Sequence, residues 1–183
     1  ASRYIIIAGQ SNASGRGELN ASNESTDSRV VTFGNDYKVH TATEPIDSPT
    51  SQVDTVSLDT VAFHSFGLRA GKDLSIAGYG NVGLIPCAKG ASTLALWYAT
   101  SNPLDRATLF GSCNNRRKVA TGGKAVTAIW WYQGEGENAS DALRQAFAAN
   151  HTTFVNNAST YFGANVPIMY AQLAKNGLET FNT

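Results

Sequence analysis

The sequence carries few charged residues and no excess of either sign. Its 183 residues include 14 Lys and Arg and 14 Asp and Glu, so the formal net charge at pH 7 is zero. A protein without net charge has no long-range field that would attract nucleic acid or an anionic membrane, and we expect no nucleic-acid partner. The only tight basic run is Arg116-Arg117-Lys118, which we interpret as a solvated helix face.

Long apolar runs and cysteines are scarce as well. No stretch approaches the roughly 20 apolar residues that a membrane-spanning helix requires, so we expect no membrane insertion. Cys87 and Cys113 are too few for a zinc site, and the sequence leaves open whether they form a disulfide or remain free thiols. The low charge and the many neutral polar residues favour a place outside the cytosol, secreted, extracellular or associated with a virion.

Short continuous apolar segments alternate with segments of helical periodicity, which is typical of a parallel sheet with helices on both faces. We expect a single domain over residues 1–183, of the α/β class, with a three-layer αβα fold and a mostly parallel sheet. The polar stretch between residues 12 and 59 is predicted to be a long surface excursion. Strands are predicted at residues 4–8, 30–33, 81–86, 125–132 and 166–173, and helices at 61–77, 94–98, 103–119 and 140–161.

Polar and small residues follow three of the predicted strands. Ser11 comes soon after strand 4–8, Gly90 lies in the loop after strand 81–86, and Gln133 follows strand 125–132. Because the carboxyl ends of parallel strands meet at one edge of the sheet, we expect these loops to form one site. A serine nucleophile needs hydrogen-bond donors for the oxyanion that it creates. The backbone N–H groups of Ser11 and Gly90 and the Gln133 side chain are suited to supply them.

Three segments carry a resemblance to a known family. AGQSNASG, then PCAKGAS followed by LW, and finally WWYQGEGEN resemble the first three sequence blocks of the SGNH hydrolase superfamily. The most similar branch contains the carbohydrate esterases of family six and the sialate O-acetylesterases. The resemblance extends from Tyr4 to about Leu173. It implies an SGNH (flavodoxin-like) hydrolase fold and a serine esterase that removes O-acetyl groups from a carbohydrate through an acyl-serine intermediate, without metal or cofactor.

The resemblance also implies roles for individual residues. Ser11 matches the nucleophile, Gly90 the oxyanion glycine and Gln133 the oxyanion side chain. Glu135 matches a glutamate of the third block, which we expect to support the site by orienting neighbouring groups. The candidate contacts to an acetylated carbohydrate substrate are Gln10, Asn12 and Trp97.

The general base of the family has no match in the sequence. The family places it in a C-terminal Asp-x-x-His segment, and none of the three histidines, His40, His64 and His151, has Asp three residues before it. We interpret His151 as a surface or packing residue, because it lies inside a predicted helix, and His64 as structural, because it starts a helix far from the expected position of the base. Only His40 lies in an excursion that could fold back over the site. We therefore expect the C-terminal part of the domain, with its base, to be missing from this sequence.

Two other functions compete with a serine esterase. A catalytically weak or inactive carbohydrate-binding or adhesin module on the same fold would keep Ser11 but lack a base. Acetate release from an acetylated glycan would exclude that alternative. A flavodoxin-like phosphate or nucleotide binder would use residues 9–17 as a cradle, but neither Gly-x-x-x-x-Gly-Lys-Ser/Thr nor Gly-x-Gly-x-x-Gly follows the first strand.

Overall fold

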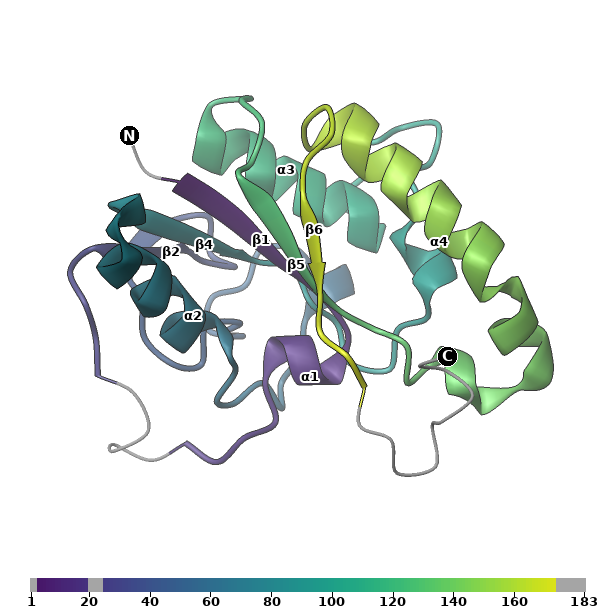
Figure 1. Cartoon of the computed structure of the whole chain (residues 1–183), viewed down its shortest axis with the longest axis horizontal. Helices are drawn as coiled ribbons and strands as arrows, with labels where there is room; N and C mark the ends of the chain where they lie inside the picture. The colour runs from purple at the N-terminus through teal and green to yellow at the C-terminus, as the bar shows by residue number, and fades with distance from the viewer. Residues whose placement is uncertain (1–2, 20–24, 174–183) are drawn as a thin grey trace.

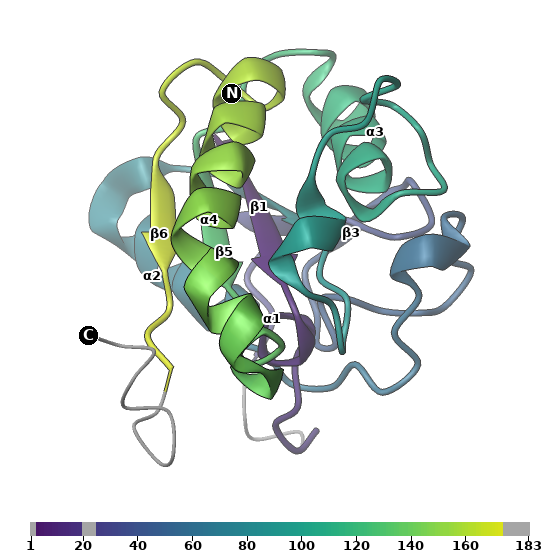
Figure 2. The same ribbon diagram turned by 90° about the vertical axis from the view of Figure 1, so that its right-hand side faces the viewer.

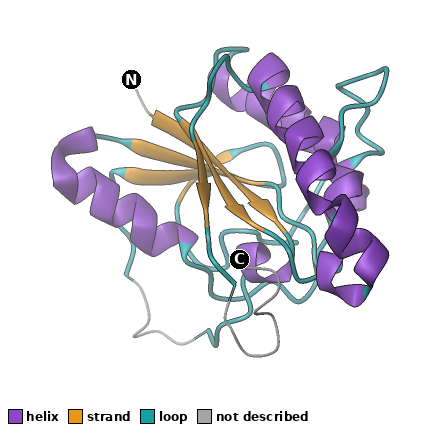
Figure 3. Ribbon diagram, turned by 45° about the vertical axis from the view of Figure 1, so that its right-hand side comes forward, coloured by secondary structure: helices purple, strands orange, loops and turns teal. Residues whose placement is uncertain are grey.

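The computed structural model describes residues 3–19 and 25–173 and contains a six-stranded sheet with the order β3-β2-β4-β1-β5-β6. All neighbouring strands are parallel except β2 and β3. Helices lie on both sides of the sheet (Figure 3), so the predicted three-layer α/β fold is confirmed. The strands are β1 Arg3–Gly9, β2 Val30–Phe33, β3 Val39–Thr41, β4 Val82–Pro86, β5 Ala128–Tyr132 and β6 Ile168–Tyr170.

Both faces of the central strands are buried, which explains why their sequences are continuously apolar. In β1, Ile5 and Ile7 pack toward α2 (Gly67–Leu74), whereas Ile6 packs toward α3 (Leu109–Thr121) and α4 (Asp141–Tyr161). Figure 1 shows α2 on one side of the sheet and the other two helices on the opposite side, and Figure 2 looks onto the face that α3 and α4 cover. The edge strand β3 was not predicted, because its three residues are all exposed.

Two helices begin later in the sequence than predicted, because contacts near their first residues fix where each helix starts. Residues before α2 are held extended by a bridge between Gly17 and His64, so the helix predicted from residue 61 starts at Gly67. Thr108 caps α3 by accepting a hydrogen bond from the Gly111 amide at 3.1 Å, so that helix starts after residue 108 rather than at 103. The short helices are α1 Ser11–Ser14, η1 Thr55–Ser57, η2 Ser75–Tyr79, η3 Leu94–Trp97 and η4 Glu137–Ala139.

Helix α4 begins one residue after the start of the predicted range 140–161. The Ser140 hydroxyl accepts a hydrogen bond from the Leu143 amide at 3.2 Å, and the helix runs from Asp141 to Tyr161. Within the ranges that the structure describes, no helix is both long and apolar enough to cross a membrane.

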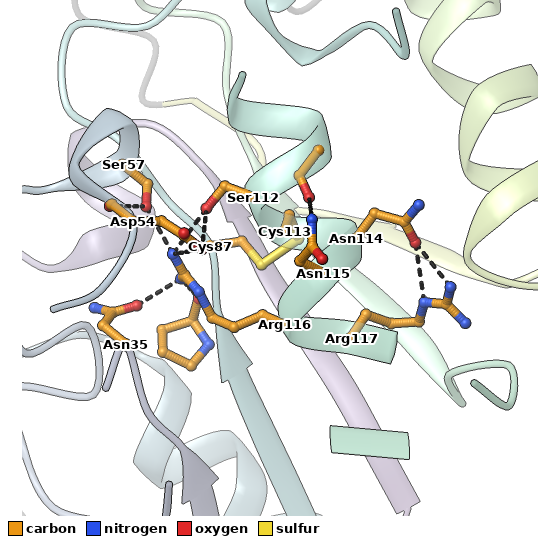
Figure 4. The surroundings of a disulfide bond; sticks show 12 residues. Asn35, Asp54, Ser57, Cys87, Ser112, Cys113, Asn114, Asn115, Arg116 and Arg117 are labelled. Carbon is orange, nitrogen blue, oxygen red and sulfur yellow. Dashed lines mark hydrogen bonds and ion pairs between the residues drawn. A yellow bond between two sulfur atoms is a disulfide. The ribbon is translucent and has the colours of Figure 1, made fainter. Parts of the chain in front are cut away.

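Arg116 is fully buried, with 0% of its surface exposed, so the predicted solvated basic face is wrong. Its guanidinium donates to Asn35 Oδ1 at 2.5 Å and to Ser57 Oγ at 2.7 Å, and it also reaches the Pro86 carbonyl. Asp54 lies 3.9 Å away and supplies the opposite charge (Figure 4). Asn35, Asp54 and Ser57 all come from the long polar excursion, which is therefore part of the buried structure rather than a surface decoration.

Cys87 and Cys113 form a disulfide, which answers the question that the sequence left open. The bond joins the end of β4 to α3, with the two Cα atoms 5.3 Å apart (Figure 4). Both residues are buried in the core on the α3 side of the sheet. The disulfide therefore anchors α3 beside the strand whose following loop contains Gly90.

A second buried acid lies next to the Arg116 cluster. Asp47 accepts a hydrogen bond from Asn35 Nδ2 at 2.7 Å, and its other carboxylate oxygen has no partner in the described part of the chain. Complete burial raises the pKa of Asp47 to about 7, although Asn35 and Arg116 act in the opposite direction. This carboxyl group therefore takes up its proton close to neutral pH.

Candidate active site at the carboxyl edge of the sheet

Ser11 lies at a tight turn directly beyond β1. Gly9 has a φ of +126°, and a Cβ atom there would lie 2.0 Å from the Tyr132 carbonyl oxygen, so only glycine fits. The Gln10 amide donates to that same carbonyl at 3.0 Å, and α1 then begins at Ser11. Ser11 is partly exposed, and neither its amide nor its hydroxyl has a hydrogen-bond partner among the described residues. Both groups are therefore available to a ligand at the carboxyl edge of the sheet.

Asp59 connects this turn to the Gly90 loop. One oxygen of the buried Asp59 carboxylate accepts hydrogen bonds from Ser14 Oγ at 2.9 Å, from Arg16 at 2.8 Å and from the Gly90 amide at 2.9 Å. A Cβ atom on Gly90 would lie 2.6 Å from the Arg16 guanidinium and 2.7 Å from that oxygen. A side chain at position 90 would therefore displace the Arg16 guanidinium and the Asp59 carboxylate from their present positions.

The charge of Asp59 is stabilised by these partners. Burial raises the pKa of the Asp59 carboxyl, but the hydrogen bonds from Arg16, Ser14 and Gly90 outweigh it and hold the pKa below its ordinary value. Asp59 is therefore ionised at neutral pH. The sequence could not identify this residue, because its partners are far away along the chain and no motif contains it.

The Gly90 amide is thus occupied by Asp59 in the free protein, whereas the neighbouring Ala91 amide is not. Ala91 is exposed and has a φ of +60°, a left-handed conformation that is uncommon for a residue with a side chain. Among the described residues, its N–H group has no hydrogen-bond acceptor. The loop after β4 consequently presents an uncommitted backbone donor at Ala91, one residue beyond the predicted one.

Gln133 is buried and links the loops to one another. Its side-chain amide donates to the Ser92 carbonyl at 2.7 Å and to Glu137 Oε2 at 3.1 Å, and it also lies 3.5 Å from Gln10 Oε1. Gln10, a predicted substrate contact, is also buried, and its Oε1 atom accepts a hydrogen bond from the Gly136 amide at 3.1 Å. In the free protein, both side chains therefore bind other parts of the site.

Glu137 also belongs to this site, although the sequence did not predict a role for it. It is buried, and its carboxylate accepts hydrogen bonds from the Leu94 amide and from Gln133. It therefore joins η4 to the start of η3. Asn12 and Glu135 form a similar link, because Asn12 Nδ2 donates to Glu135 Oε1. That contact fits the expectation that Glu135 orients neighbouring groups.

Trp97, which the sequence places against the substrate, is buried in the core, with 0% of its surface exposed. Its indole packs edge-on against Trp131 with the ring centroids 5.4 Å apart, and its Nε1 atom donates to Ser92 Oγ at 3.3 Å. The exposed side chains of this short helix are instead those of Ala95 and Leu96. The prediction for Trp97 was wrong because η3 directs its side chain into the core. A sequence motif does not specify the direction in which a side chain points.

Each of the three histidines has a separate environment. His40 lies in the edge strand β3 and binds Asp36 at 2.9 Å, and His151 binds the Tyr170 hydroxyl at 2.7 Å from α4. His64 lines a pocket together with Asn12 and Arg16, and its Nε2 atom has no partner in the described part of the chain. None of these rings is hydrogen-bonded to Ser11. Residues 3–19 and 25–173 also contain no group of His, Cys, Asp and Glu that could hold a metal ion.

Comparison with known proteins supplies the family. A family model described as carbohydrate esterase, sialic acid-specific acetylesterase, matches residues 2–183. No curated protein matches the sequence. Among solved structures, a protein from Arabidopsis thaliana is similar with a TM-score of 0.80 and 20% identity, over 98% of this chain and 78% of that one.

Two further solved structures are also similar. A carbohydrate acetylesterase from Xanthomonas citri has a TM-score of 0.67 and 16% identity, over 93% of this chain and 41% of that one. NanS has a TM-score of 0.64 and 15% identity, over 99% of this chain and 71% of that one. At these identities the similarity shows the fold alone, and the family assignment comes from the match to the family model. The chain belongs to the carbohydrate esterase family of sialic acid-specific acetylesterases.

Proposed function

We propose that this protein is a serine esterase that removes O-acetyl groups from a carbohydrate through an acyl intermediate on Ser11. The proposal rests on the free hydrogen-bonding groups of Ser11 in a chain that belongs to this carbohydrate esterase family. Its hydroxyl and amide are uncommitted, among the described residues, at the carboxyl edge of a parallel sheet, where ligands bind in open α/β folds. One of the similar structures is a carbohydrate acetylesterase, which supports this chemistry.

The proposed reaction has two steps. Ser11 Oγ attacks the acetyl carbonyl carbon, the Ser11 proton passes to a base, and the sugar alkoxide leaves as the alcohol after it takes up a proton. Water then attacks the acetyl-Ser11 ester, which releases acetate and restores the hydroxyl. In both steps a tetrahedral oxyanion forms, and backbone N–H groups that point at it lower the barrier.

The Ser11 amide is the first oxyanion donor that we propose. Gly90 and Gln133 remain the donors that the family resemblance predicts, yet their N–H groups already have internal acceptors in the free protein. The Ala91 amide has none among the described residues, so we propose it as the donor from the second loop. In this proposal Asp59 is a positioning residue, because it connects the Gly90 loop to α1.

The base is proposed to come from outside the described residues. None of the rings of His40, His64 and His151 is hydrogen-bonded to Ser11, and a serine hydroxyl without a base loses most of its reactivity. A disulfide between buried cysteines is typical of an oxidising compartment. That bond supports our further proposal that the protein acts outside the cytosol, on an acetylated glycan.

The test is acetate release from O-acetylated sialic acid and from an acetylated xylan oligosaccharide. A form of the protein that includes the base should release acetate, and Ser11→Ala in that form should reduce the rate to that of buffer. Ser101→Ala, which changes an exposed serine, is the matched control and should keep the wild-type rate. Equal rates in the wild type and the Ser11→Ala variant would overturn the proposal, and glycan binding without any turnover would favour an inactive binding module.

A further inference from the structure

A pocket of about 530 Å³ lies beside the Ser11 turn. Asn12, which directly follows Ser11, belongs to its lining, together with Arg16 from the same segment. Tyr132 at the end of β5 forms another wall, and its carbonyl oxygen accepts the hydrogen bond from the Gln10 amide that shapes the turn. The volume is within the range of small-molecule sites in proteins. The pocket therefore adjoins the position at which we propose that the ester binds.

Two aromatic side chains line this pocket. The rings of Phe66 and Tyr132 have centroids 6.5 Å apart, and their planes are inclined by 52°. Both side chains are partly exposed. The faces of aromatic rings carry partial negative charge, which attracts the weakly positive C–H groups on the face of a sugar ring. The aromatic pair therefore offers a packing surface for one sugar ring.

Two polar atoms of the lining remain available beside these rings. The Tyr132 hydroxyl has no hydrogen-bond partner among the described residues, and unlike that of Tyr98 it is not enclosed. Burial and the charge of Glu135 raise the pKa of Tyr132, so the hydroxyl keeps its proton at neutral pH and can donate. Asn12 donates to Glu135 through Nδ2, which leaves its amide oxygen free to accept. Aromatic surface next to a few such polar groups suits the hydroxyls of a sugar.

Arg16 is the only permanent cation among the described lining residues, and it is already committed to the protein. Its Nη2 atom donates to the Asp59 carboxylate at 2.8 Å. Its Nη1 atom donates to Ser14 Oγ at 2.8 Å and to the Val61 carbonyl at 3.1 Å. A carboxylate on a ligand would have to displace these contacts to pair with both ends of the guanidinium. Arg16 therefore forms part of the wall and is poorly suited to bind an anion.

The surroundings of the pocket are also rich in acids. Three carboxyl groups contact residues of the lining: Asp59 contacts Arg16, Glu135 contacts Asn12, and Glu44 contacts Ser65. The charge of Asp59 is balanced by Arg16, whereas Glu135 has no cation among its described partners. An additional carboxylate on the ligand would therefore meet unbalanced negative charge and be repelled.

We infer that this pocket binds an uncharged sugar ring of the acetylated substrate, and that the chain discriminates against a sugar whose ring carries a carboxylate. The inference rests on the proposed function for the place of the ester, and it deepens that function by naming the class of sugar. The description of the family refers to sialic acid, which is a carboxylated sugar. The inference thus gives this chain a specificity different from the one that the description of its family implies.

The test is the binding of two ligands that differ in a single charge, N-acetylneuraminic acid and its carboxamide. Each is titrated into the full chain at pH 8 and low ionic strength, and binding is followed through the backbone NMR signals. Because unbalanced negative charge lies next to the pocket, the carboxamide should bind roughly threefold or more tightly than the acid. Added salt should bring the two affinities closer together, since it screens exposed charges.

Tyr132→Phe tests whether binding occurs in this pocket. The variant should bind the carboxamide roughly fivefold more weakly, because it keeps the ring and removes the free hydroxyl. Tyr79→Phe is the matched control: Tyr79 is 51% exposed and does not line the pocket, so this variant should bind like the wild type. Glu135→Gln should reduce the difference between the two ligands.

Three results would overturn the inference: an acid that binds as tightly as the carboxamide or more tightly, a carboxamide that does not bind, or carboxamide binding that Tyr132→Phe leaves unchanged. Binding is measured without turnover and needs no base. A failure of the proposed function would instead be seen as acetate release that does not depend on Ser11, so the two failures are distinguishable.

Discussion

Asp47→Asn should make the folded protein more stable at neutral and alkaline pH. Burial raises the folded-state pKa of Asp47 from 3.8 to about 7, so between these values the folded state holds a proton that the unfolded chain has released. The contribution of Asp47 to the free energy of unfolding is therefore greatest below pH 4, and it falls as the pH rises toward 7. At about 1.4 kcal/mol per pH unit, the loss over this interval is roughly 4 kcal/mol.

The asparagine variant removes this loss while it keeps the contact. The side-chain carbonyl that the variant places at position 47 still accepts from Asn35, and a neutral amide replaces the carboxyl whose second oxygen has no partner in the described part of the chain. Urea unfolding, followed by tryptophan fluorescence at pH 4, 5.5, 7 and 8.5, measures the effect. Plots of the free energy of unfolding against pH should coincide for the two proteins near pH 4 and diverge above it. Parallel curves, or a variant that is less stable at pH 8.5, would refute the reasoning.

Asp73→Asn is the matched control for this experiment. Asp73 forms an exposed ion pair with Arg69, and exposed pairs of this kind contribute about 0–1 kcal/mol. Its stability should therefore differ little from that of the wild type at every pH tested. A divergence as large as that of Asp47→Asn would show that the effect comes from net charge rather than from burial.

Three further predictions concern the contacts around the site. Asp59→Asn should lower Ser11-dependent acetate release by roughly tenfold or more with little change in KM, because the loop that carries a proposed oxyanion donor loses its anchor; an unchanged kcat would contradict this. Gly90→Ala should cost about 1–3 kcal/mol of stability in urea unfolding, since its Cβ atom would lie within 2.7 Å of Arg16 and Asp59. The double variant Cys87→Ala/Cys113→Ala should lose about 3.5 kcal/mol, and equal stability in the presence and absence of the disulfide would argue against this estimate.

The sheet could be predicted from the sequence because its strands are buried on both faces. Continuous apolar segments such as residues 4–8 and 128–132 have few alternatives to a parallel central strand. The cap at Ser140 was predictable for a similar reason, because the hydrogen bond that it makes is local. The starts of α2 and α3 were not, since they depend on the bridge to His64 and on the capping residue that the chain selects.

The candidate site was predicted in its backbone position but not in its hydrogen bonds. Motif and topology together brought Ser11, Gly90 and Gln133 to the same edge of the sheet. The roles of Asp59 and Arg116 depend on partners that are remote along the chain, and no pattern of neighbouring residues encodes such contacts. The inward turn of Trp97 has the same origin, because its packing against Trp131 decides its orientation.

The most direct test of Ser11 as the nucleophile is mass spectrometry of the intact protein and its peptides after treatment with an alkyl fluorophosphonate. Such a reagent forms a stable bond with an activated serine, at the position that the acetyl group would occupy. The account predicts a single adduct on the peptide that contains Ser11, its absence in Ser11→Ala, and a slower reaction in Asp59→Asn. An adduct on another serine, or labelling of Ser11 no faster than that of the exposed Ser101, would contradict the account.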